Sequence, residues 1–329
     1  MYNETDKNTK TEVFIMKYGF GVDLGGTTVK IAVFDQEGTA LRKWEIPTVT
    51  ANHGQQILPD IAASIQSYLD TADVDKADII GVGIGVPGPV SSKGIVNKCV
   101  NLGWGVFNIE ETLSGLTGLP VKAGNDANVA ALGECWKGGG QGCDNIVMAT
   151  LGTGVGGGII IDGKMVYGVH GAGGEIGHLV LNRNETEQCG CGKRGCVEQY
   201  CSANGVARLG EKVLKECTTP SSLRDIFPLT SKDIFGAAAE GDALALQITE
   251  QVYAYLGEFL ANICNVVDPE VVVLGGGMSK AGQPLLEGVQ KYFGNFVFHG
   301  AKDVRFALAS LGNDAGAYGA FKLVLDAYG

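Results

Sequence analysis

The stretch FGVDLGGTTVKIAVFD, residues 20–35, shares its pattern with VMATLGTGVGGGIIID, residues 147–162. Gly25 corresponds to Gly152 and Asp35 to Asp162, each 127 residues further along the chain. Each stretch combines two apolar strands with a turn rich in Gly or Thr between them, and so predicts a β-hairpin. A repeated hairpin predicts two related domains that face each other across a cleft, although chance likeness of two glycine-rich hairpins is an alternative.

Alternating strands and helices around these hairpins predict an α/β protein. Apolar runs at 79–86, 119–123 and 271–274 indicate buried strands, and helical spacing occurs over 57–68, 127–136, 244–266 and 315–327. We expect a flexible N-terminal extension over 1–17, a small domain formed by 18–124 with 312–329, and a large domain over 125–311 that carries a Cys-rich loop.

The composition limits the classes of partner. The formal charge is −11, which disfavours binding to nucleic acid and to anionic membranes but not to small neutral ligands. Nine cysteines in a chain of 329 residues, without a secretory apolar run, indicate a reducing cytosol instead of a disulfide framework. We therefore expect a cytoplasmic protein that does not enter a membrane.

Three glycine turns have the composition of a phosphate-binding cleft. The first runs from Gly25 and Gly26 to Thr27 and Thr28 behind Asp23, a carboxylate placed to reach Mg²⁺ through water. The others are 152–154 (Gly, Thr, Gly) and 275–277 (three glycines), and all three can offer backbone N–H groups to a polyphosphate. The first turn runs into a strand and is not a P-loop. Purely structural turns remain the alternative reading.

A metal site is predicted by Cys189, Cys191 and Cys196, with His178 as the fourth ligand. Three thiols and one imidazole suit tetrahedral Zn²⁺, and four protein ligands indicate a structural ion. Such an ion would order the loop between Glu175 and Glu198. Three reduced cysteines packed beside a turn are the alternative.

Asp126 is the candidate general base, because it follows a strand end near a glycine and because phosphoryl transfer to a hydroxyl needs a proton acceptor. Its alternative role is to cap the helix that follows. Polar side chains that suit a polyhydroxylated ligand occur at Asn101, Asn125, Glu175, His178 and Glu198.

These motifs resemble the ROK family of sugar kinases, most closely its bacterial glucokinases. The resemblance runs in order from about residue 18 to the C-terminus, through DLGGTTVK (23–30), VPGP (86–89), NLGW (101–104), NDAN (125–128), LGTGVGGG (151–158), EIGH (175–178) and CGCGKRGCVE (189–198). It implies an actin-like, ribonuclease-H-like fold of two domains, ATP and Mg²⁺ in the interdomain cleft, structural zinc and a homodimer.

The resemblance also implies roles for individual residues. Asp126 would be the catalytic base. Glucose would be bound by Gly88, Asn101, Asn125, Asp126, Glu175, His178 and Glu198. The nucleotide would be held by Asp23, Gly25, Gly26, Thr27, Thr28, Lys30, Gly152, Thr153, Gly154, Gly275, Gly276 and Gly277. The metal ligands would be His178, Cys189, Cys191 and Cys196.

Glu175 in Glu-Ile-Gly-His favours glucose over the substrates of related kinases. The alternatives are mannose, an N-acetylhexosamine or fructose as acceptor, and polyphosphate as donor. A non-catalytic sugar sensor is a more remote alternative. The residues ahead of Tyr18 are too few for the winged DNA-binding domain of the family's repressors, which agrees with the acidic charge.

Overall fold

The computed structural model describes residues 16–329, so the predicted extension lies almost entirely outside the described residues. The strands are β1 (Tyr18–Leu24), β2 (Thr28–Asp35), β3 (Ala40–Pro47), β4 (Ile79–Val86), β5 (Ile95–Val96), β6 (Phe107–Asn108), β7 (Val121–Asn125), β8 (Ile146–Leu151), β9 (Val155–Ile161), β10 (Lys164–Met165), β11 (Val271–Gly275) and β12 (Arg305–Leu308). The α-helices are α1 (Ala51–Gly54), α2 (Ile57–Leu69), α3 (Ile109–Thr117), α4 (Asp126–Lys137), α5 (Glu198–Cys201), α6 (Ala203–Glu216), α7 (Ser231–Ala239), α8 (Ala243–Val267), α9 (Gln283–Phe293) and α10 (Ala315–Tyr328).

The first five-stranded sheet has the order β3-β2-β1-β4-β7. Strands β1, β2 and β3 are antiparallel neighbours, whereas β4 runs parallel to β1 and to β7. Residues on β2 alternate between its two faces: Ile31 and Val33 pack with α2 and α3, while Ala32 and Phe34 pack with α10. The last helix of the chain thus covers one face of the first sheet.

The second five-stranded sheet has the order β10-β9-β8-β11-β12. Its β8–β9 hairpin is antiparallel, as the β1–β2 hairpin is, and β11 runs parallel to β8 and to β12. Helix α4 packs on one face through Val129 and Leu132. The other face is covered by a larger cluster that includes Val147 on β8 and Leu260 on α8.

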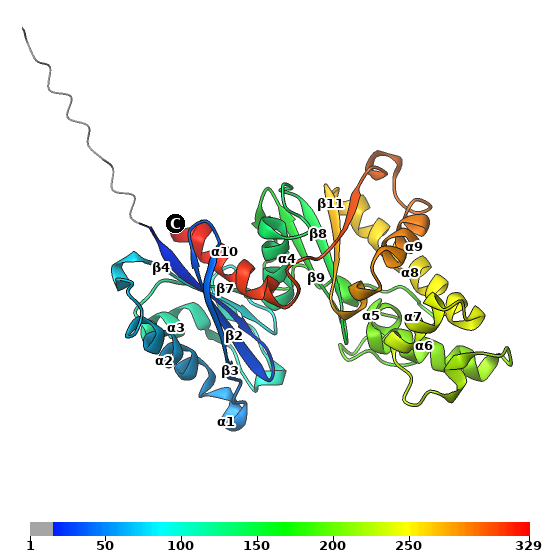
Figure 1. Cartoon of the computed structure of the whole chain (residues 1–329), viewed down its shortest axis with the longest axis horizontal. Coiled ribbons are helices and arrows are strands. Elements are labelled where there is room, and N and C mark those ends of the chain that lie inside the picture. Colours follow the sequence, from blue (N-terminus) through cyan, green and yellow to red (C-terminus); the bar gives the residue numbers. More distant parts are fainter. Residues whose placement is uncertain (1–15) are drawn as a thin grey trace, which may run out of the picture.

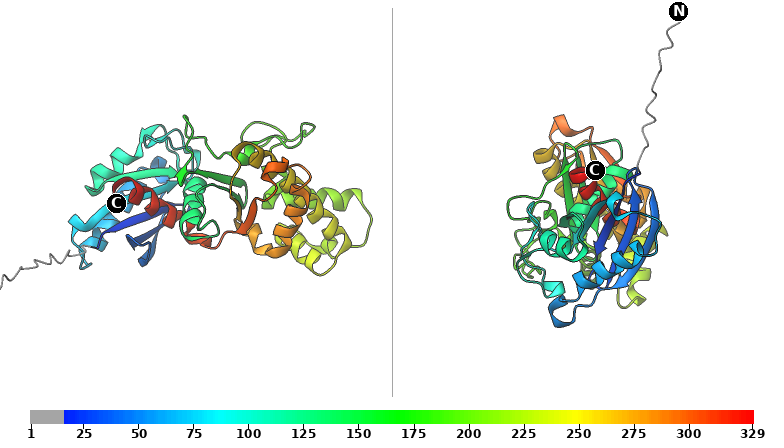
Figure 2. Two further views of the ribbon diagram at one scale, coloured as in Figure 1. Left: turned by 90° about the horizontal axis from the view of Figure 1, so that it is seen from above. Right: turned by 90° about the vertical axis from the view of Figure 1, so that its left-hand side faces the viewer.

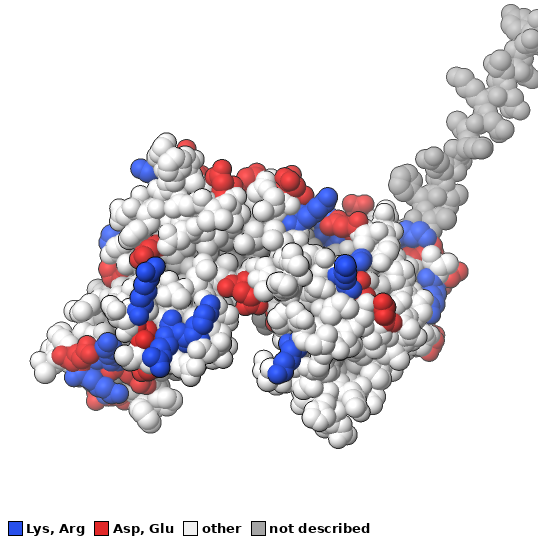
Figure 3. Space-filling view, turned by 180° about the vertical axis from the view of Figure 1, so that it is seen from behind, with Lys and Arg blue, Asp and Glu red and all other residues white. Residues whose placement is uncertain are grey.

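Helices α4 and α10 lie together between the two sheets (Figure 1). Their backbones approach closely at glycines, because a Cβ on Gly133 would stand 2.3 Å from the Ala315 carbonyl oxygen and one on Gly319 would stand 1.7 Å from that of Val129. Two lobes are also visible after a 90° turn (Figure 2), and the space-filling view shows a hollow between them (Figure 3).

The predicted α/β architecture with two lobes and a cleft is confirmed, and so is the repeated hairpin. The predicted helices at 57–68, 127–136, 244–266 and 315–327 correspond to α2, α4, α8 and α10. The residue bounds of the two domains stay a prediction. Within residues 16–329, no helix has the length and apolar character needed to cross a bilayer.

Candidate active site

Asp126 lies at the junction where β7 ends and α4 begins. Asn125 is the N-cap of α4, and its Oδ1 accepts hydrogen bonds from the backbone N–H groups of Ala127 and Asn128, both at 3.1 Å. Asp126 Oδ1 also accepts from the Ala127 N–H, at 2.8 Å. The capping function predicted as an alternative for Asp126 is therefore carried mainly by Asn125.

The electrostatic surroundings of Asp126 suit a proton acceptor. The pKa of Asp126 is raised to about 6, mainly by burial and also by the carboxylates of Asp23 and Glu175, while the Ala127 N–H opposes the rise. Asp126 therefore lies near one carboxylate from the first glycine turn and another from the loop before His178. A carboxylate with such a pKa is ionised at neutral pH and still takes up a proton readily.

Asp23 stands at the end of β1, beside the first glycine turn. Its carboxylate lies beside Gly316 in the first turn of α10, where a Cβ would stand 2.6 Å from Asp23 Cγ, and Lys30 Nζ lies 3.7 Å from Asp23 Oδ2. Burial raises the pKa of Asp23, while Lys30 opposes the rise. The turn itself is closed by a hydrogen bond of 3.0 Å from the Gly25 N–H to the Thr28 carbonyl, and a Cβ built on Gly26 would meet open space among the described residues.

Asn125 also connects α4 to the turn after β4. Its Nδ2 donates to the Gly88 carbonyl at 3.2 Å. A Cβ on Gly88 would lie 3.4 Å from the Cβ of Cys99, so this turn packs against the short turn that carries Asn101. Asn101 itself is exposed. Three of the predicted sugar contacts, Gly88, Asn101 and Asn125, thus lie on adjacent turns of the first lobe.

The remaining predicted sugar contacts lie near the cysteines in the second lobe. Glu175 precedes the 3-10 turn Ile176–His178. His178 faces two ways, since its Nε2 lies 3.9 Å from Glu175 Oε2 and its Nδ1 lies 3.9 Å from Cys189 Sγ. One ring nitrogen is therefore directed to the cysteines and the other to the Glu175 carboxylate, so that His178 can serve both as a metal ligand and as a sugar contact.

The four predicted metal ligands come together in the structure. One ligand atom from each of His178, Cys189, Cys191 and Cys196 lies within 4.8 Å of the other three. Cys191 Sγ and Cys196 Sγ are 3.6 Å apart. Tetrahedral Zn²⁺ with Zn–S bonds of about 2.3 Å places two thiolates about 3.8 Å apart, so this cluster fits the ion closely.

Glu198 lies between the metal cluster and the second glycine turn. Its Oε2 accepts from the Val155 N–H at 3.1 Å, and its Oε1 lies 3.7 Å from Cys189 Sγ. The turn formed by Gly152, Thr153 and Gly154 also contacts the third turn, because a Cβ on Gly276 would stand 2.6 Å from the Leu151 backbone. The second and third predicted nucleotide turns are therefore neighbours.

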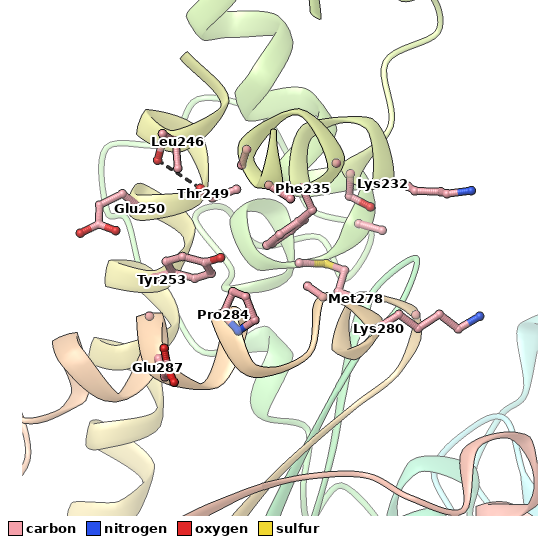
Figure 4. Close-up of a pocket in the computed structure, with 18 of the residues that line it drawn as sticks. Lys232, Phe235, Leu246, Thr249, Glu250, Tyr253, Met278, Lys280, Pro284 and Glu287 are labelled. Atoms are coloured by element: carbon pink, nitrogen blue, oxygen red, sulfur yellow. Dashed lines mark hydrogen bonds between the residues drawn. The ribbon is translucent and has the colours of Figure 1, made fainter. Parts of the chain in front are cut away.

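A cavity of ≈ 1430 Å³ opens beside these two turns, between α7, α8 and α9 (Figure 4). Gly152, Thr153 and Gly277 stand on its wall. Its apolar lining includes Phe235, Leu246, Tyr253, Met278 and Pro284, and Lys232 and Lys280 extend from its rim.

Sequence reasoning missed this cavity because its lining residues are spread over α7, α8, α9 and the turns that carry Thr153 and Met278. The sequence did contain a signal for the start of α7, one of the helices that line the cavity. Thr230 and Asp233 form a capping box there, just before Phe235.

The profile of the ROK family matches residues 19–327, and the chain belongs to this family. The family resemblance that was inferred from the sequence motifs is therefore confirmed.

Two relatives and one solved structure show where the chain lies within the family. It is 42% identical to the glucokinase of Halalkalibacterium halodurans, over 92% of this chain and 94% of the relative. It is 35% identical to the glucokinase of Thermotoga maritima, over 94% of this chain and 98% of the relative. The crystal structure of a ROK family glucokinase from Streptomyces griseus, in complex with glucose and AMPPNP, superimposes with a TM-score of 0.73 at 32% identity, covering 94% of this chain and 98% of that one.

Proposed function

We propose that this protein is a glucokinase that transfers the γ-phosphoryl group of ATP to the 6-hydroxyl of glucose. The observation that carries the proposal is the burial of Asp126 at the start of α4, where the charges of Asp23, beside the first glycine turn, and of Glu175, in the second lobe, both act on its carboxyl group. A hydroxyl bound there would stand between a phosphate-binding turn and a proton acceptor. The glucokinase relatives described above support the same activity.

In the proposed reaction, Asp126 takes the proton from the 6-hydroxyl as that oxygen attacks the γ-phosphorus. The raised pKa of Asp126 fits this role, because the group is mostly ionised at pH 7 and gains a proton at little cost. Mg²⁺ bound with the nucleotide would neutralise charge on the phosphates. Asp23 is the carboxylate placed to hold it, and the glycine turns supply N–H groups to the phosphate oxygens.

The cavity beside Gly152 and Gly277 supports ATP over polyphosphate as the donor. An apolar wall that includes Phe235, Tyr253 and Met278 suits a nucleoside, whereas polyphosphate has no apolar part to bury. The phosphates would then extend from this cavity toward the first glycine turn and Asp126.

We propose structural zinc at His178, Cys189, Cys191 and Cys196. The ion would fix the orientation of the His178 ring, whose other nitrogen faces Glu175. Glucose would be held from one lobe by Gly88, Asn101 and Asn125, and from the other by Glu175, His178 and Glu198. The homodimer implied by the family resemblance stays a prediction, and so do the domain bounds 18–124 with 312–329 and 125–311.

The test is a coupled assay with Mg²⁺ that compares glucose, mannose, N-acetylglucosamine and fructose as acceptors, each with ATP and with polyphosphate. We expect the highest kcat/KM for glucose with ATP. Faster turnover of another hexose would reassign the acceptor. Glucose binding without any ADP formation would replace the kinase by a sugar sensor.

A further inference from the structure

Asn128, in the first turn of α4, is a buried polar residue to which neither the motifs nor the proposed reaction assign a role. It is 4% exposed. Its Nδ2 donates to the Gly173 carbonyl at 2.8 Å and to Asn125 Oδ1 at 3.3 Å. The two bonds point in different directions: one stays within the start of α4, and the other reaches the segment that leads to Glu175.

The other end of this carboxamide has no hydrogen-bond partner. Asn128 Oδ1 is the one buried side-chain nitrogen or oxygen atom without a partner among the described residues. A buried, unpaired acceptor destabilises the fold, so such an atom calls for an explanation. The two hydrogen bonds of Nδ2 explain why a donor is present at this position, but they do not explain the unpaired oxygen.

Gly174 shows what the unpaired oxygen faces. Gly174 has φ +84, and a Cβ built on it would stand 2.6 Å from Asn128 Oδ1 and 2.9 Å from the Gly157 carbonyl oxygen. The backbone just before Glu175 is thus held between the Asn128 carboxamide and β9. Any residue other than glycine would be strained at this φ and would push against Asn128.

We infer that Asn128 is a positioning residue that fixes the Glu175 loop relative to the start of α4, and so sets the spacing between Glu175 and Asp126. Through Asn125, the same contact extends to the Gly88 carbonyl. The inference rests on the proposed function, in which one carboxylate binds the sugar and the other accepts its proton. In this arrangement Asn128 does not touch the substrate. It acts through its hydrogen bonds to Asn125 and to the Gly173 carbonyl.

The chemistry of the side chain explains why a carboxamide is needed. The atoms that face Nδ2, Asn125 Oδ1 and the Gly173 carbonyl, are both acceptors. A carboxylate in place of the amide would set acceptor against acceptor, and an apolar side chain would leave the Gly173 carbonyl without its donor.

The first experiment compares wild-type protein with Asn128→Ala in steady-state kinetics and in calorimetric titration with sugar, without nucleotide. We expect KM and Kd for the sugar to rise about 10-fold and kcat to fall about 10-fold, because both carboxylates lose their alignment. The KM for ATP should stay within about 2-fold, since the nucleotide cavity and the second and third glycine turns make no hydrogen bond with Asn128 among the described residues.

Thr117→Val is the matched control. Thr117 is 7% exposed, donates to the Leu113 carbonyl and accepts from the Leu119 N–H, in the first lobe at the end of α3. This variant should lower Tm without changing the KM of either substrate. If Asn128→Ala behaves like Thr117→Val, with both KM values unchanged and kcat reduced only in proportion to the folded fraction, the inference is overturned.

A double-mutant cycle with Gly174→Ala addresses the same contact from its other side. Gly174→Ala should also raise the sugar KM, and the double variant should lose less than the product of the two single effects, because removing Asn128 Oδ1 relieves part of the clash. Independent, multiplicative effects would contradict the inference.

The titrations use whichever hexose the wild-type protein phosphorylates fastest. A wrong assignment of glucose as the substrate can therefore be told apart from a wrong assignment of Asn128 as a positioning residue.

Discussion

The β1–β2 turn and the β8–β9 turn share one backbone plan but have different neighbours. The first turn lies beside Asp23 and Lys30 and is close to Asp126. The second is bound to Glu198 near the metal cluster, and it opens onto the apolar cavity. A repeated hairpin has thus acquired two kinds of chemistry. Changes near the first turn should affect kcat, and changes near the second should affect substrate affinity.

The largest effect is expected at the first turn. Asp126→Asn removes the proton acceptor but keeps the shape of the side chain, so kcat should fall by about 10² to 10⁴-fold while glucose affinity changes little. Stopped-assay kinetics together with glucose titration measure both quantities. Wild-type turnover in this variant would remove Asp126 from the mechanism and, with it, the contrast between the two turns.

The next effect concerns the metal cluster beside the second turn. Cys191→Ser should release the ion and raise the glucose KM by about 10-fold or more, because His178 and Glu175 lose their fixed orientation. Elemental analysis should find one zinc per wild-type chain and none in the variant. Freshly purified wild-type protein without zinc would refute the assignment of the ion.

A cavity variant separates the nucleotide from the sugar. Phe235→Ala should raise the KM for ATP by about 10-fold and leave the glucose KM unchanged, since a buried aromatic contact with the nucleoside is lost. Val266→Ala, at a side chain that is 85% exposed, serves as the control. An unchanged ATP KM in Phe235→Ala would place the nucleoside elsewhere.

The pH profile reports on the burial of Asp126. The reaction needs the ionised form of Asp126, whose pKa is about 6. The value of kcat/KM for glucose should therefore be level above pH 7 and about 10-fold lower at pH 5. This acidic limb should disappear in Asp126→Asn. A profile that stays flat down to pH 5 would show that Asp126 does not titrate in this range.

The smallest expected effect is on stability. Burial raises the pKa of Asp126 in the folded protein to about 6, above the ordinary value of 3.8. The ionised side chain therefore destabilises the fold, and this cost grows as the pH rises from the lower value to the higher one. Asp126→Asn should therefore raise the free energy of unfolding by about 1–2 kcal/mol at pH 7, with the gain vanishing below pH 4. Urea denaturation at both pH values measures it. A less stable variant at pH 7 would indicate that local hydrogen bonding outweighs the burial of charge.

Sequence reasoning succeeded where chemistry is local in the chain. The repeated hairpin, the strand end before Asp126 and the spacing of Cys189, Cys191 and Cys196 could all be read from short stretches. The cavity could not, because Phe235, Met278 and their neighbours come together only through the packing of α7, α8, α9 and the 3-10 segment Gly277–Ala281. The unpaired oxygen of Asn128 is likewise a property of tertiary structure, since its burial depends on a loop 45 residues away.

The position of α10 has a consequence for how the protein is made. This helix is synthesised long after β1, β2 and β3, yet it covers a face of the sheet that these strands form, with Phe321 stacked on Phe34. One face of the first sheet therefore stays uncovered until α10 has been synthesised, and during that interval Phe34 and Ile80 are exposed to chaperones or to aggregation. Shortening the C-terminus by one helix should thus damage the lobe that is synthesised first.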